Sequence, residues 1–361
     1  MTERVDLPAG LDAQLTAHFE RSRQYFQSLG TACPQALILG GGYGRNEGGV
    51  AANAAGAPCF FNDLDYFVFT DRPRDAALLT AVQRWERAES KLLGVDVEAK
   101  CLARCDLAQT GESMMFFDLV LGHTVVLGPG DFLQSYRSLA QAESIHAIEA
   151  TRLLWNRGSG LLFARVDLEA GRDLEVVHRN QSKVKLALGD AWLTVRGLYQ
   201  SHACERHKVL CEQVDVAARI KELHQCGLAF KLNPTRAPEL AELERIQVEL
   251  VAHWRRCFLE VEAVRLATSF ADSAGYVTYP QRLFPARSLW RNLLLSARDR
   301  LRRGGALRPL GDYPRGALQR VLLALLEAEP DYLKVSRLLG TPVFSLSAAV
   351  AVYRKWWEFY S

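Results

Sequence analysis

Two carboxylates stand two residues apart in the segment Asn62-Asp63-Leu64-Asp65. In an extended backbone, residues i and i+2 lie on one face of a strand, with Cα atoms about 6–7 Å apart. Two carboxylates this close repel, and one tends to take up a proton unless a cation neutralises the pair. Asp63 and Asp65 are therefore candidate ligands of a hard divalent ion, Mg²⁺ or Mn²⁺. The alternative is a pair of turn residues before a strand, where Asn and Asp are common.

A third carboxylate would complete a set of oxygen ligands. The segment 94–99 (GVDVEA) alternates valines with acids, so that Asp96 and Glu98 lie on the same face of a predicted strand. Two ions held by such carboxylates, about 3.5–4 Å apart, can stabilise the attacking and leaving oxygens of a phosphoryl displacement. These acids therefore indicate phosphoryl chemistry if the strands are neighbours.

A glycine cluster, Gly40-Gly41-Gly42-Tyr43-Gly44, follows the short apolar run of residues 36–39 (ALIL). This pattern predicts a buried strand that enters a tight turn. Without side chains, backbone N–H groups can approach a triphosphate closely. Two other nucleotide motifs are excluded: no Gly-Lys-[Ser/Thr] ends a P-loop, and position 47, where G-x-G-x-x-G requires glycine, is Glu.

The series LILGGGYGRNEGG, NDLDYFVF and VDVEAK resembles the polymerase-β-type nucleotidyltransferase superfamily, in particular its minimal and small-substrate members with a helical C-terminal domain. The resemblance covers about residues 30–130. It implies that Gly41 and Gly42 hold the triphosphate and that Asp63 and Asp65 bind metal. The third acid and metal ligand would be Asp96, because it stands between two apolar residues; Glu98 competes for that role.

The resemblance further implies that Arg45, which follows the turn, reaches a phosphate. Two departures from the family pattern concern the same region. Gly42 replaces the usual Ser, which removes a hydroxyl contact to phosphate, and the segment AANAAGAPCFF lengthens the gap to Asp63. Neither departure removes an acid.

The elements that must position these residues are predicted as follows. Strands are expected at 36–39, 66–69, 94–99 and 123–127, with a loop at 50–59. Helices are expected in the first thirty residues and at 75–93. The fold class is α+β: a small mixed sheet with flanking helices, followed by a larger all-α domain.

These elements divide the chain into three expected segments. Residues 1–30 form a helix that packs on the catalytic domain, 31–130 the nucleotidyltransferase domain, and 131–361 a helical domain with a possible break near 233 or 280. The helical domain is expected to contain helices within 184–199, 237–270, 289–303, 315–328 and 344–360.

Three residues of the helical part are candidates to face the nucleotide. Related two-domain enzymes place a helix of the second domain against the nucleotide cleft, which makes Lys183, Lys185 and Asp190 candidate cleft residues; the alternative is a solvated helix face. Arg196 and His202 have an Arg-x5-His spacing that resembles helical RNase domains, but one short pattern among many Arg and His residues is weak support.

Composition limits the partners. The net charge is +3, too mild to indicate a nucleic-acid binder by itself. Eight cysteines occur without a Cys-x-x-Cys pair, and reduced thiols are expected. The N-terminus lacks an apolar signal region and no long apolar run occurs, so the sequence predicts a cytoplasmic protein without a membrane partner. The sequence leaves open whether the protein forms a homo-oligomer.

The expected reaction is Mg²⁺-dependent transfer of a nucleoside monophosphate, with ATP the expected donor, to a hydroxyl of a small molecule or a protein, releasing pyrophosphate. The alternatives are a non-catalytic nucleotide-binding regulator and a toxin–antitoxin-type nucleotidyltransferase or its helical RNase partner. Composition and spacing do not identify the acceptor.

Overall fold

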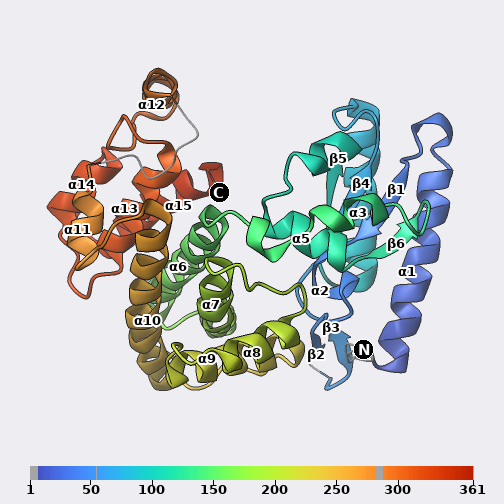
Figure 1. Ribbon diagram of the computed structural model, residues 1–361, viewed down its shortest axis with the longest axis horizontal. Helices are drawn as coiled ribbons and strands as arrows, with labels where there is room; N and C mark the ends of the chain where they lie inside the picture. The colour runs from blue at the N-terminus through green and yellow to red at the C-terminus, as the bar shows by residue number, and fades with distance from the viewer. Residues whose placement is uncertain (1–6, 54, 281–287, 361) are drawn as a thin grey trace. The chain divides into compact units, whose positions relative to one another are not determined.

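The computed structural model describes residues 7–53, 55–280 and 288–360, and divides into two compact units (Figure 1). Unit 1 comprises residues 1–149 and 196–235, and unit 2 comprises 150–195 and 236–361. The boundary predicted at residue 130 differs from this division, because residues 131–149 and 196–235 belong to the same unit as the N-terminal sheet. The last change of unit lies beside Asn233-Pro234, one of the two predicted breaks.

A four-stranded mixed sheet forms the centre of unit 1, in the order β5-β4-β1-β6. Its strands are β1 (Ala36–Leu39), β4 (Leu64–Phe69), β5 (Val97–Leu102) and β6 (Thr124–Leu127). β1 pairs antiparallel with β4 and β6, whereas β4 and β5 run parallel. The predicted α+β class with a small mixed sheet is confirmed.

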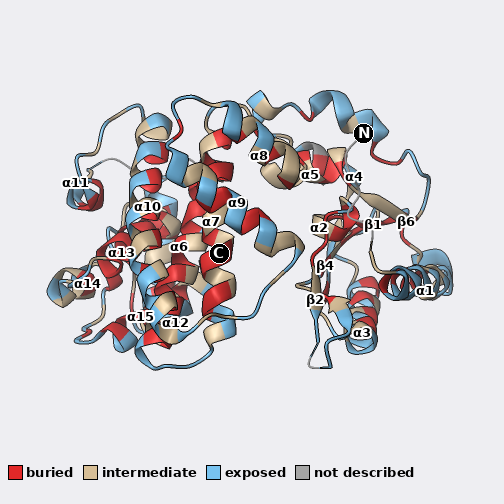
Figure 2. Ribbon diagram, turned by 90° about the horizontal axis from the view of Figure 1, so that it is seen from below, coloured by how far each residue is buried: buried red, intermediate tan, exposed pale blue. Residues whose placement is uncertain are grey.

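Both faces of this sheet are covered by helices. On one face, Leu37, Tyr66 and Val68 pack in a core with Leu15 of α1 (Ala9–Gln27) and with Trp85 of α3 (Ala76–Leu93). On the other face, residues of alternate parity such as Ile38 and Phe67 pack against α5 (Met114–Leu121). β1 is buried along its whole length, as Figure 2 shows in red, which explains the continuous apolar run ALIL.

The two helices predicted in this region are confirmed. The Asp75 side chain accepts a hydrogen bond from Leu78 N at the start of α3, and Gly94 ends the helix with φ +72°. In α1, Leu11, Leu15 and Phe26 are buried at helical spacing. Residues 1–6 of the predicted N-terminal segment lie outside the described residues.

A two-stranded hairpin replaces the loop predicted at 50–59. β2 (Val50–Ala52) pairs antiparallel with β3 (Pro58–Phe60), in the register Val50↔Phe60. Phe60 is buried against Tyr43, with ring centroids 5.4 Å apart. The sequence does not reveal this hairpin because most of its residues are small. The one bulky side chain that anchors it, Phe60, is the last residue of β3.

The rest of unit 1 is helical. Its remaining elements are the 3-10 turns η1 (Gly30–Ala32), η2 (Gln134–Leu139) and η3 (Ala142–Ser144), and the helices α2 (Gly41–Gly44), α4 (Arg104–Ala108), α8 (Ala203–Glu212) and α9 (Ala218–Leu232).

Unit 2 consists of helices throughout its described residues. They are α6 (Ile148–Glu169, whose first two residues belong to unit 1), α7 (Leu174–Thr194), α10 (Leu240–Leu266), α11 (Ser273–Thr278), α12 (Leu289–Arg303), α13 (Pro314–Leu325), α14 (Tyr332–Leu339) and α15 (Leu346–Tyr360). Four of them, α10, α12, α13 and α15, lie within a few residues of the predicted ranges. α7 begins ten residues before 184, and α6, α11 and α14 were not predicted. The predicted break near 280 adjoins residues 281–287, which lie outside the described residues.

A buried carboxylate ties three of these helices together. Glu262 of α10 accepts hydrogen bonds from Tyr276 of α11 at 2.7 Å and from Thr151 of α6 at 2.5 Å, and pairs with Arg265 at 2.6 Å. A buried charge needs such partners, because its desolvation otherwise costs several kcal/mol. Among the described residues, no helix is both long enough and apolar enough to cross a membrane.

Candidate metal site

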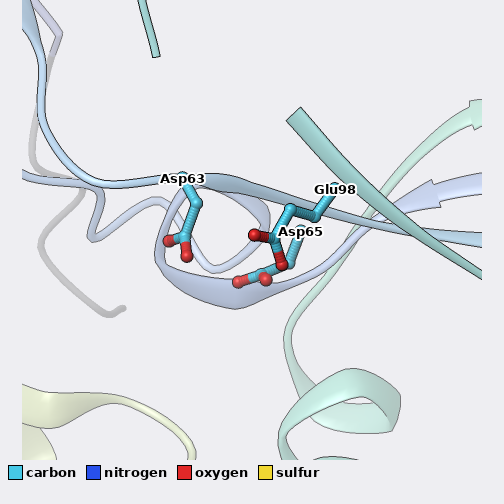
Figure 3. A group of neighbouring side chains, drawn as sticks. All are labelled: Asp63, Asp65 and Glu98. Carbon is cyan, nitrogen blue, oxygen red and sulfur yellow. The ribbon is translucent and has the colours of Figure 1, made fainter. Parts of the chain in front are cut away.

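Three carboxylates meet where two parallel strands begin (Figure 3). Asp65 is the second residue of β4, Glu98 is the second residue of β5, and the register pairs them directly. Asp63 comes immediately before β4. One carboxylate oxygen from each residue lies within 4.8 Å of the other two. Within the described ranges, this is the single group of three or more acidic, His or Cys side chains with such spacing.

The structure places Glu98, not Asp96, in this group. β5 begins at Val97, so the exposed Asp96 stands outside the strand, and its carbonyl accepts a hydrogen bond from Leu64 N at 2.9 Å. The preference for Asp96 as third acid and metal ligand rested on its apolar neighbours, and the geometry does not support it. Glu98 lies opposite Asp65 because the pairing of β4 with β5 fixes the register, which a single strand's sequence does not reveal.

The donor set suits a hard divalent cation. All three ligands are carboxylates, and Asp63 and Glu98 are exposed while Asp65 is half-buried, so the site is open on one side. Oxygen ligands of this kind select Mg²⁺ or Mn²⁺, which keep water or phosphate oxygens in their remaining positions.

The glycine turn lies directly against the acids. The Gly40 N–H donates to the carbonyl of Asp65 at 2.8 Å, and Gly41 has φ +59°, in the left-handed region that favours glycine. A Cβ at residue 41 would lie far inside van der Waals contact with the Asp65 carboxylate. Both the backbone conformation and the position of the Asp65 carboxylate therefore favour glycine at 41.

Gly42 is under a weaker constraint. A Cβ there would come no closer than 3.4 Å to its nearest neighbour, the carbonyl oxygen of Glu47, which is an ordinary contact. Gly41 and Gly42 open the helical turn α2, where N–H groups have no acceptor within the helix. Their predicted contact with a triphosphate stays a prediction, but these N–H groups are the donors it would use.

Arg45 is held by two carboxylates. Its Nε lies 2.9 Å from Glu47 Oε1 and its Nη1 lies 3.1 Å from Asp118 Oδ2, with the side chain only 10% exposed. Burial would lower the pKa of Arg45, but Asp118 and Glu47 outweigh it and raise the pKa. The predicted role of Arg45 as a phosphate contact therefore competes with two ion pairs that already neutralise it.

Glu47 is a residue that the sequence reasoning missed. Its carboxylate accepts from Ala203 N at 2.8 Å and pairs with Lys231 at 3.0 Å, while Lys231 also donates to the Glu47 carbonyl. Burial would raise the pKa of Glu47, but the charges of Lys231, Arg45 and Arg206 lower it to about 2. Glu47 thus joins α8 and α9 to the end of the glycine turn, a contact more than 150 residues apart in sequence that no local pattern reveals.

The candidate residues of the helical part belong to unit 2. Lys183, Lys185 and Asp190 lie on α7, where both lysines are half-buried and Asp190 is buried. A fully solvated helix face, the alternative reading, does not fit a buried Asp190. The predicted contact of these three residues with a nucleotide stays a prediction.

The Arg-x5-His pattern does not lie on one helix. Arg196 and His202 fall in the segment between α7 and α8, and Arg196 pairs with Asp215 at 3.1 Å. The resemblance of this spacing to helical RNase domains stays a prediction.

Comparison with models of known protein families, with curated proteins and with solved structures finds no match.

Proposed function

We propose that this protein is a divalent-metal-dependent nucleotidyltransferase, which moves a nucleoside monophosphate from a nucleoside triphosphate to a hydroxyl group and releases pyrophosphate. The observation that carries the proposal is the triad of Asp63, Asp65 and Glu98 at the start of two adjacent strands, with Gly41 packed against Asp65. ATP is the proposed donor and Mg²⁺ the proposed ion, and the acceptor is a small molecule or a protein.

The triad supports phosphoryl transfer because each part has a chemical task. The three carboxylates provide charge and oxygen donors on the open side of the strands. Bound there, Mg²⁺ would neutralise charge on the phosphates and orient the attacking and leaving oxygens. The N–H groups of Gly41 and Gly42 lie at the start of the turn α2, where they have no acceptor within the helix and can donate to a phosphate.

The reaction balances with these groups alone. The acceptor oxygen forms a bond to the α-phosphorus, the bond from that phosphorus to the bridging oxygen breaks, and pyrophosphate leaves with its electron pair. The hydroxyl proton passes to a carboxylate of the triad; Glu98 is the proposed base. Positioning and charge stabilisation account for most of the catalysis in such transfers.

Thermal unfolding with ATP, GTP, CTP and UTP, each with and without Mg²⁺, tests the binding step. A ligand at 100 times its dissociation constant stabilises the folded protein by about 2.7 kcal/mol, which raises the midpoint by a few degrees. We expect a Mg²⁺-dependent shift for one nucleotide in the wild type and none in Asp65→Asn. No shift with any nucleotide would contradict the proposal.

Turnover separates an enzyme from a nucleotide-binding regulator. α-³²P-labelled nucleotide incubated with protein and a cell extract should yield a labelled product and pyrophosphate. Wild type should form it, and Asp63→Asn and Asp65→Asn should not. Metal-dependent nucleotide binding without any product would favour the regulator, an alternative to which the replacement of Ser by Gly42 gives weak support.

A further inference from the structure

Unit 1 contains a second polar site, a cavity of about 430 Å³ on the other side of the turn α2 from the acids. Its lining includes the polar residues Arg45, Asn46, His123, Gln134, Arg137 and His202. A cavity of this size suits a small-molecule ligand.

The cavity and the acids share one end of the sheet. Leu39, the last residue of β1, pairs with Tyr66 of β4 and with Thr124 of β6. Gly41 packs against Asp65, whereas a Cβ at Gly44 would lie 3.6 Å from the Cα of His123. The turn α2 therefore stands between the acids and the cavity.

Polar side chains converge on the cavity without partners in the protein. No residue in the described part of the chain forms a side-chain hydrogen bond or an ion pair with Asn46, Gln134, Arg137 or His202. Polar groups that line a cavity in this way can bind a ligand. A small number of such groups is enough to fix the orientation of the ligand.

The charges that face the cavity favour an anion. Arg137 is exposed and unpaired, and Asp131 is the one acidic side chain in the lining, itself exposed. The lining residue Arg45 belongs to a charged group that also contains the cations Lys231 and Arg206 and the carboxylates Glu47 and Asp118. The balance of this group is one positive charge.

Two histidines, His123 and His202, add ring nitrogens that can form hydrogen bonds. Burial lowers the pKa of His123, and the nearby guanidinium of Arg137 lowers it further. His123 therefore favours its neutral form, and Arg137 is the exposed positive charge of the lining. Guanidinium groups bind phosphate and carboxylate through paired hydrogen bonds.

We propose that this cavity binds a small ligand through a phosphate or carboxylate group, which Arg137 and His202 contact. The site is distinct from the metal triad and does not depend on the proposed transferase activity.

Inorganic phosphate and malonate, each titrated at constant ionic strength, are the probes that test the proposal and distinguish the two anions. Binding is followed by thermal unfolding and by ¹H–¹⁵N spectra of the histidine rings. We expect saturable binding of at least one probe, with shifts of the His123 and His202 signals beyond those of the other six histidines.

Variants locate the site. The double variant Arg137→Gln/His202→Gln should bind the probe at least about tenfold more weakly, because charge-assisted hydrogen bonds are lost. Arg84→Gln, an exposed arginine of α3 outside the cavity, should bind as the wild type does. Asp65→Asn should also retain the anion while it loses metal-dependent nucleotide binding, so the two proposals fail separately.

Two results would overturn the proposal. The first is the absence of saturable binding of both phosphate and malonate to the wild type. The second is equal affinity of the wild type and the double variant, which would show that the anion binds elsewhere.

Discussion

Asp65 is the residue on which the candidate site depends most, since it contacts both neighbours. Across the strands it faces Glu98, and across the turn it lies against Gly41. Any side chain at position 41 would displace its carboxylate. Because Gly41 has no side chain, the Asp65 carboxylate can occupy its position in the site. This effect is separate from any contact between the Gly41 N–H and a phosphate.

Gly41→Ala should abolish divalent-metal binding at a modest cost in stability. The left-handed backbone costs an alanine about 1–2 kcal/mol, and the added Cβ pushes away the flexible end of Asp65. Gly30→Ala is the matched control, because Gly30 has φ +58° with open space around its Cβ. Urea unfolding should show similar losses for both, whereas Mn²⁺ titration should show binding only in Gly30→Ala. Wild-type Mn²⁺ affinity in Gly41→Ala would contradict this role.

Sequence reasoning predicted part of this arrangement. The i, i+2 spacing of Asp63 and Asp65 and the adjacent glycine turn could be recognised because both are local. The choice between Asp96 and Glu98 could not, because it depends on where β5 begins and on its register with β4.

At the scale of elements, the Glu47 cluster joins the turn to the helix pair α8–α9. Glu47 follows the turn by three residues, and its partners Ala203 and Lys231 lie on α8 and α9. The buried carboxylate is charged only because these cations and N–H groups surround it. The position of the turn should therefore depend on the ionisation of Glu47.

Acid should weaken this connection. The folded-state pKa of Glu47, about 2, lies below the ordinary value of 4.5, so the unfolded chain binds the proton more readily. The resulting stability, about 3 kcal/mol, is present above pH 4.5 and is lost as the pH falls towards 2. Between pH 6 and pH 3, the free energy of unfolding, measured with urea, should fall by about 2 kcal/mol more in the wild type than in Glu47→Gln.

The control for this measurement is Glu212→Gln, which removes an exposed carboxylate from α8. It should follow the wild-type pH dependence closely. Equal pH dependence of the wild type and Glu47→Gln would show that Glu47 is not the ionised centre of the cluster.

The sequence predicted some helices and strands more accurately than others. α3 was predicted closely, because Asp75 and Gly94 mark its ends and its apolar stripe is regular. The β2–β3 hairpin was missed, because three-residue strands of small side chains carry little periodicity and are held by Phe60.

The whole molecule consists of units that the chain enters more than once. Unit 1 is built from residues 1–149 and 196–235, and the second segment covers buried residues of the first. Phe230 packs on Phe61 and Tyr199 packs on Phe117, with ring centroids 5.6 and 5.7 Å apart. A division at residue 130 would separate these contacts, whereas the observed division keeps them within one unit.

A fragment of residues 1–149 should therefore not fold stably by itself. It would lack the residues that pair with Glu47, and it would expose apolar surface that Tyr199 and Phe230 cover. Joined through a Gly/Ser linker to residues 196–235, it should unfold cooperatively, because Gly197 lies close to Glu143 and the ends can be bridged. Circular dichroism during thermal unfolding distinguishes the two fragments. A stable, cooperative 1–149 fragment would contradict this account of unit 1.

Mn²⁺ binding, measured by the electron paramagnetic resonance of free Mn²⁺, tests the central claim most directly, because it needs no acceptor and no choice of nucleotide. Glu98→Gln and Asp96→Asn each remove one charge from acids only two residues apart. The account predicts saturable binding in the wild type and in Asp96→Asn, and at least about tenfold weaker binding in Glu98→Gln. Unchanged binding in Glu98→Gln, or an equal loss in Asp96→Asn, would contradict the triad of Asp63, Asp65 and Glu98.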